Sequence, residues 1–171
     1  MLKILGMIFV VASSAAVGFG FAAGVRAQAV QLQQLISALE YMKNEISYRL
    51  TPLPELFSLL ASPEGKPVST FFACCAQSMQ QSPAASVHGV FLDAMQRTPQ
   101  LALPQTARQT LLELSLSLGK FDTAGQMGAI ALASDRLRQQ LQVLEARRRE
   151  RCRSYETIGV CAGLALAVIL L

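Results

Sequence analysis

The stretch LISALEYMKNEISYRLTPLPE, residues 35–55, indicates how the middle of this chain folds. In this stretch and just before it, apolar residues recur at the spacing of one helix face, so residues 27–49 are predicted to form an amphipathic helix. Thr51 is a natural N-cap, and Pro52 suits the first helical position, where its missing N–H costs nothing. The sequence therefore predicts a turn at Thr51 and a short helix through Ala61. The apolar positions of the first helix are Leu32, Leu35, Ile36, Leu39, Met42 and Ile46.

Clusters of Pro, Gly and Ser divide the rest of the middle into further helices. We expect helices over residues 68–80, 84–97 and 105–118, with Gly119 ending the third of these in the left-handed conformation. Asp122 is expected to cap a last helix. No β-alternation of useful length occurs, so the sequence predicts an all-α bundle of six helices. Its expected core positions are Phe71, Phe72, Cys75, Met79, Val87, Phe91, Met95, Leu111, Leu112, Leu114, Leu118, Ile130, Leu137, Leu141 and Leu144.

Both ends of the chain are apolar enough to suggest membrane helices. The 171 residues are 52% hydrophobic, and the mean hydropathy is +0.38. Residues 4–25 carry no charge, and as a helix they would span about 33 Å, close to the roughly 30 Å of a hydrocarbon core. Residues 157–171 are also uncharged but would reach only about 22 Å. We therefore expect transmembrane helices over residues 1–25 and 157–171, each continuing a helix of a bundle over residues 26–156.

The N-terminal segment has an alternative interpretation as a cleaved secretory signal. Lys3 would form its positive region, and Ala27-Gln28-Ala29 has the form of a cleavage site. The apolar stretch is longer than that of a typical signal, and Arg26 lies just before the cut, so the membrane anchor is favoured. A secreted helical protein is the alternative that the mass of the mature N-terminus would test.

Positive charges near the second span predict the topology. Five arginines lie within residues 147–153, and no charged side chain follows the span. Because positive residues tend to remain cytoplasmic, we expect the bundle in the cytoplasm and both termini on the other side. Nucleic acid is a poorer partner for this charge, since residues 26–135 hold 7 Lys/Arg against 8 Asp/Glu. The arginines expected to anchor the span are Arg147, Arg148, Arg149, Arg151 and Arg153.

The sequence offers little to a catalytic mechanism. His88 is the single histidine, and a lone helical histidine is usually structural. Adjacent Cys74 and Cys75 do not form a C-x-x-C redox pair. The segment LGKFD, residues 118–122, lacks the Ser or Thr and the earlier glycine of a phosphate-binding loop. We therefore expect no enzyme activity, no cofactor and no metal site.

Glycines recur at four-residue spacing in both predicted spans. Gly20 and Gly24 form one G-x-x-x-G pair, and Gly159 and Gly163 form another. This spacing lets two membrane helices approach closely. The spans are expected to pack on each other or on a partner's spans, although glycine is common in membrane helices without such a role.

The whole chain resembles the stage III sporulation protein AB family of endospore-forming bacteria. The likeness is densest in residues 35–55, at Leu-Ile, Ala-Leu-Glu, Glu-Ile, Tyr and Thr-Pro-Leu-Pro. It continues in LGKFDTAGQ at Leu118, Gly119, Asp122 and Gln126, and then at Tyr155, Gly159 and Gly163 in the terminal apolar run. Many relatives carry a tryptophan in the fourth helix, where this chain has Phe91.

The resemblance implies a non-enzymatic role in a membrane complex. Members are similar to the inner-membrane platform proteins of type II secretion and type IV pilus machines. The implied function is a subunit of the channel complex joining mother cell and forespore. The chain would sit in the outer forespore membrane and face the mother-cell cytoplasm. Its implied partners are the complex's cytoplasmic ATPase and other membrane subunits, and homo-oligomerisation is left open.

Two segments are expected to contact partners. One is the turn around Thr51 with Glu45 nearby, and the other is the segment that follows Leu118. A purely structural role is the alternative for both, since Thr51, Pro52 and Leu53 could simply begin a helix. A two-span adaptor or regulator unconnected with sporulation is the alternative function. The candidate contact residues are Glu45, Tyr48, Thr51, Pro52, Leu53, Pro54, Glu55, Leu118, Gly119, Asp122 and Gln126.

Overall fold

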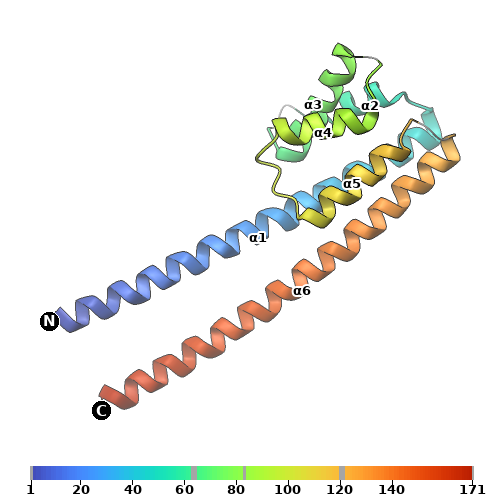
Figure 1. Ribbon diagram of the computed structural model, residues 1–171. Helices are drawn as coiled ribbons and strands as arrows, with labels where there is room; N and C mark the ends of the chain where they lie inside the picture. Colours follow the sequence, from blue (N-terminus) through green and yellow to red (C-terminus); the bar gives the residue numbers. More distant parts are fainter. Residues whose placement is uncertain (1, 63–64, 83, 120–121, 171) are drawn as a thin grey trace. The chain divides into compact units, whose positions relative to one another are not determined.

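The computed structural model describes the backbone of residues 2–62, 65–82, 84–119 and 122–170. Side chains are described for Gly24 and for residues 26–146 within those stretches. Every regular element there is an α-helix, which confirms the predicted all-α fold with six helices (Figure 1). The helices are α1 (Leu2–Arg49), α2 (Leu53–Leu60), α3 (Pro67–Gln81), α4 (Val87–Arg97), α5 (Gln105–Ser117) and α6 (Thr123–Leu170).

The chain divides into two units, which are described separately. One contains residues 1–25 and 142–171, and the other contains residues 26–141. Helices α1 and α6 run through both units, each unbroken for 48 residues, as the absence of internal prolines predicted. Among the described residues, no helix has both the length and the apolar character needed to cross a membrane. Side chains of the predicted spans lie outside the described residues, apart from Gly24, so the spans remain predictions.

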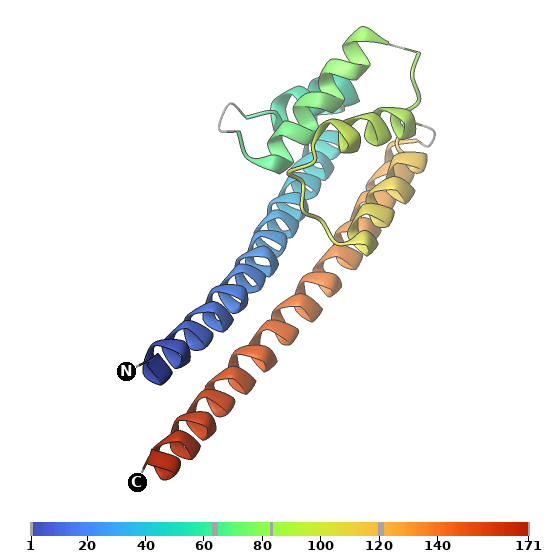
Figure 2. The ribbon, with the colours of Figure 1, turned by 60° about the vertical axis from the view of Figure 1, so that its left-hand side comes forward.

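In the second unit, the helices form two groups. The part of α1 after Arg26, α5 and the first half of α6 lie alongside one another, and α2, α3 and α4 gather beside them (Figures 1 and 2). Four buried phenylalanines hold the second group together: Phe57, Phe71, Phe72 and Phe91. The ring centroids of Phe71 and Phe72 lie 5.2 Å apart, and those of Phe57 and Phe72 lie 5.9 Å apart. Truncating such a residue to alanine typically costs about 3–5 kcal/mol.

The predicted core of α1 is confirmed. All six of its periodic apolar positions are buried, with Leu32, Leu39 and Met42 fully inaccessible. Five predicted core positions on the other helices are only half-buried. They are Met79, Met95, Leu112, Leu141 and Leu144.

The predicted start of α2 is wrong by one residue, and that of α4 is wrong by three. Pro52 is the N-cap of α2 instead of its first residue, and Thr51 does not cap the helix. The hydroxyl of Thr51 instead donates to the Glu45 carboxylate at 3.2 Å. Helix α4 begins at Val87 instead of residue 84, because the Ser86 hydroxyl accepts from the Gly89 N–H at 3.1 Å. A side-chain cap at Ser86 thus fixes that helix start.

Polar side chains tie the first group of helices together. The buried amide of Gln31 on α1 accepts from the Ala102 N–H at 2.7 Å and donates to the Gln100 carbonyl at 3.3 Å. Arg138 on α6 pairs with Glu40 on α1. Helix α1 is therefore bonded both to α6 and to the linker that precedes α5.

Candidate partner-binding surface

The turn between α1 and α2, residues 48–55, exposes apolar side chains. Tyr48 is 85% exposed and Leu50 is 69% exposed. Leu50 has φ +54° and is, within the described residues, the one non-glycine residue with positive φ. This left-handed conformation costs an L-residue roughly 1–2 kcal/mol. Burial of the Leu50 side chain does not offset that cost, because most of it remains in water.

One carboxylate holds both neighbours of Leu50. The Glu45 carboxylate accepts from the Thr51 hydroxyl at 3.2 Å and lies 3.6 Å from the Arg49 guanidinium. The Glu45 side chain is only 12% exposed, whereas that of Arg49 is 74% exposed. Glu45 is therefore placed to fix the turn, whereas Arg49 remains largely in water.

The described residues of the α5–α6 turn, 118–119 and 122–126, follow common patterns of helix termination. Leu118 is the buried C-cap residue of α5, and Gly119 follows with φ +80°, as predicted. The Asp122 carboxylate accepts from the Gly125 N–H at 3.0 Å and so caps α6, which confirms the expected role of Asp122. Gly119 and Asp122 are both exposed.

The two turns meet although about 65 residues separate them in the sequence. A Cβ built on Gly119 would lie 3.8 Å from Leu53 Cδ1 and 3.5 Å from Val87 Cγ2. Leu53 begins α2, so the α1–α2 turn and the α5–α6 turn lie against each other. Of the predicted partner-binding residues, Pro52, Pro54, Glu55, Gly119 and Asp122 are exposed. Leu118 is buried, and the Glu45 side chain is only 12% exposed.

The remaining predicted residues fall largely outside the described side chains. Of the membrane-packing glycines, only Gly24 is described, and a Cβ added there would meet nothing within 4 Å. The glycines whose surroundings are not described are Gly20, Gly159 and Gly163, and the anchor arginines likewise not described are Arg147, Arg148, Arg149, Arg151 and Arg153.

A serine–histidine contact joins α4 to α5. His88 Nδ1 lies 2.9 Å from Ser115 Oγ, a distance that also suits a nucleophile and its base. Ser115 is only 2% exposed, and its hydroxyl proton goes to the Leu112 carbonyl at 2.6 Å. The histidine must therefore donate to Ser115 instead of accepting its proton, so the pair joins α4 to α5 without activating the serine.

Among the residues that the structure describes, the buried Cys75 is unsuited to thiol chemistry and no metal cluster is found. Burial raises the pKa of the Cys75 thiol well above its ordinary value, which leaves it protonated and unreactive. In the same residues, no group of three or more His, Cys, Asp or Glu side chains could hold a metal ion.

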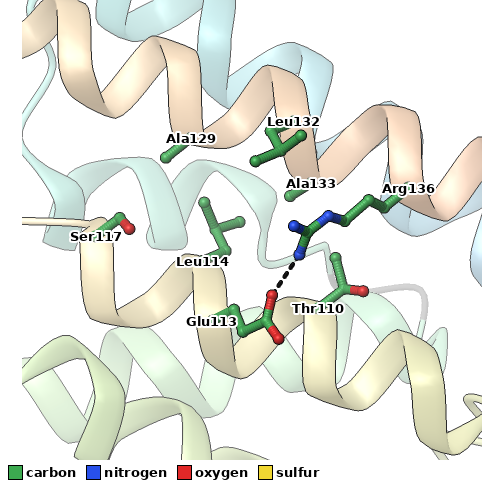
Figure 3. A pocket seen from close by; sticks show the side chains of 8 residues that line it. All are labelled: Thr110, Glu113, Leu114, Ser117, Ala129, Leu132, Ala133 and Arg136. Atoms are coloured by element: carbon green, nitrogen blue, oxygen red, sulfur yellow. Dashed lines mark hydrogen bonds and ion pairs between the residues drawn. The ribbon is translucent and has the colours of Figure 1, made fainter.

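A shallow recess lies between α5 and α6 (Figure 3). The Arg136–Glu113 ion pair crosses it, and its volume is about 160 Å³. Ligand sites are usually about 300–1,000 Å³, so this recess is small for a metabolite or cofactor. Its lining residues are Thr110, Glu113, Leu114, Ser117, Ala129, Leu132, Ala133 and Arg136.

Comparison with known proteins gives the family. The sequence profile of stage III sporulation protein AB matches residues 3–171. This chain belongs to the stage III sporulation protein AB family. A curated relative of that name from Bacillus subtilis (strain 168) is 27% identical over 172 residues, covering all of both chains. A solved structure of stage III sporulation protein AB superposes with a TM-score of 0.66 at 23% identity, covering 72% of this chain and 98% of that one.

Membership of the stage III sporulation protein AB family confirms the resemblance found in the sequence. The family is described by its part in sporulation and not by a chemical reaction, so the chain is a sporulation protein. The solved relative supports the same helical fold.

Leu50 is the feature of this surface that sequence reasoning missed. The residue directly after a helix often adopts the left-handed conformation, and glycine usually occupies it. A leucine immediately after α1 gave no such signal, although its place between Arg49 and the Thr51-Pro52 break could have drawn attention to it.

Proposed function

We propose that this chain is a non-enzymatic platform subunit of the channel complex between mother cell and forespore, and that it docks the cytoplasmic ATPase of that complex. Family membership along residues 3–171 supports a role in sporulation. The observation that supports the docking proposal is the proximity of Leu53 and Gly119, because it brings exposed residues of both turns close together. A surface of this kind suits a protein partner better than a small ligand.

The proposed setting is the outer forespore membrane. Spans over residues 4–25 and 157–171 would anchor the chain, and the arginines of residues 147–153 favour a bundle in the mother-cell cytoplasm. A membrane-impermeant thiol reagent tests this in sporulating cells, using variants whose single cysteine lies either in the bundle or at a terminus. The proposal expects labelling of the bundle cysteine only after the mother-cell membrane is opened. Labelling of that cysteine in intact cells would contradict the orientation.

Docking is tested with the full-length chain in detergent and the ATPase encoded in the same operon. Wild type should form a defined complex, measured by pull-down and light scattering. Glu55→Lys reverses an exposed charge on the shared surface, so it should lower recovery at least fivefold without changing the helical circular dichroism. Glu145→Lys is the matched control, since Glu145 is exposed on α6 outside both turns.

The outcomes separate the alternatives. Absence of any wild-type complex would contradict ATPase docking and favour an adaptor unconnected with this complex. A wild-type complex that Glu55→Lys leaves intact would move the docking site elsewhere on the bundle. Loss of helicity in the variant would support a structural role for Glu55.

A further inference from the structure

The strained Leu50 lies in a patch of exposed residues that commonly anchor protein interfaces. Tyr41 and Tyr48 are 40% and 85% exposed, and their seven-residue separation places both on one face of α1. Arg49 and Leu50 follow directly. Tyr and Arg are enriched among the residues that dominate binding energies. The turn therefore presents a tyrosine, an arginine and a leucine in succession.

Folding alone does not account for a leucine at this position. Glycine or asparagine would adopt the same backbone with less strain, and a leucine that is 69% exposed gains little from the core. Strained residues that persist in folded proteins cluster at functional sites. The Glu45 carboxylate restrains the residues on both sides of Leu50, so the structure maintains this conformation.

We propose that Leu50, flanked by Tyr48, is an apolar anchor that enters a recess on the docked ATPase, and that Glu45 is the positioning residue that holds it out. The inference rests on the proposed function and names the contact within it. The Arg49 side chain is 74% exposed although it pairs with Glu45, so carboxylates at the border of the partner recess would complement its charge. The expected partner is thus a protein surface with an apolar pocket and an acidic rim.

The test compares substitutions that separate binding from stability. Leu50→Gly and Leu50→Asn remove the apolar side chain but suit the left-handed backbone. The full-length variants in detergent should bind the ATPase at least tenfold more weakly while melting at or above the wild-type temperature. Leu50→Met keeps an apolar side chain and should stay within about threefold of wild type. Leu92→Ala is the control, because Leu92 is an exposed leucine on α4.

The positioning role of Glu45 needs its own variants. Glu45→Gln keeps an acceptor for the Thr51 hydroxyl, whereas Glu45→Ala removes both contacts. We expect Glu45→Ala to weaken ATPase binding about fivefold. Glu45→Gln should retain most of the wild-type affinity. Equal losses of ATPase affinity in Glu45→Ala and Glu45→Gln would contradict the positioning role of Glu45. Arg49→Gln should lower affinity two- to fivefold and flatten the dependence of affinity on salt concentration.

Four results would overturn the inference, and they are distinguishable. Wild-type binding that persists in Leu50→Gly would remove the anchor and leave the proposed function standing. A clear fall in the melting temperature of Leu50→Gly would show that the side chain supports the fold. If Leu50→Gly changed the mass of the chain measured without the ATPase but left its ATPase affinity unchanged, Leu50 would be assigned to a contact with a second copy of this chain. Absence of wild-type binding would overturn the proposed function together with this inference.

Discussion

Both turns of the candidate surface contain a residue with positive φ, but it is leucine in one turn and glycine in the other. Leu50 follows α1 directly, whereas the extended Leu118 separates Gly119 from the end of α5. Gly119 has φ +80° after α5, and Leu50 has φ +54° after α1. The α5–α6 turn also buries Leu118 and caps the next helix with Asp122. The α1–α2 turn leaves its leucine in water and gives the hydroxyl of Thr51 to Glu45. One turn follows the rules of helix termination, and the other departs from them at an exposed position.

Substitution of Leu118 or Leu50 by alanine should give the largest difference in stability between the two turns. Leu118→Ala removes a side chain that is 2% exposed and should lower the free energy of unfolding by about 3 kcal/mol. Leu50→Ala should change it by less than about 0.5 kcal/mol, as most exposed substitutions do. Urea unfolding followed by circular dichroism measures both. Comparable losses at the two sites would remove the distinction between the turns.

The left-handed residues provide the next contrast. Gly119→Ala should destabilise the fold by about 1–2 kcal/mol, because alanine is strained at positive φ. The neighbouring Val87 and Leu53 atoms would be at ordinary contact distances, so steric overlap should add little. A stable Gly119→Ala variant would show that the backbone can relax out of the left-handed region at this turn.

Loss of the helix cap should have an intermediate effect. Asp122→Ala removes the bond to the Gly125 N–H and should cost about 1 kcal/mol of stability. Asp122→Ser keeps a capping oxygen and should recover most of the loss. The free energies of unfolding from the same urea titrations decide this. Equal stability of the alanine and serine variants would contradict the capping role.

The smallest effect is expected at Thr51. Thr51→Ala breaks the hydrogen bond to Glu45, which lies at a partly exposed site, and should cost about 0.5 kcal/mol. If Thr51 were the N-cap that the sequence suggested, the loss would approach that of Asp122→Ala. Thr51→Val, which keeps the volume of the side chain, should match the alanine variant within error.

Periodic apolar patterns predicted most of the fold. The details of the surface depended instead on which of several possible hydrogen-bond partners a side chain takes, as Thr51 takes Glu45. Leu32 through Ile46 marked the buried face of α1 correctly because a 23-residue pattern leaves little room for another register. The start of α2 was misplaced because Pro52 and Pro54 both suit a helix beginning, and Glu45 engages the hydroxyl of Thr51. No local pattern could predict that Leu53 would meet Gly119, since that contact depends on how the helices pack.

Gln31 gives the α4–α5 linker a property that its irregular backbone would not suggest. The side-chain amide bonds an N–H and a carbonyl of the linker, much as a peptide group in a neighbouring strand would. Two hydrogen bonds thus attach the linker to α1. A small sliding or rotation of α1 within the bundle would therefore pull on the beginning of α5 directly, without first deforming the core.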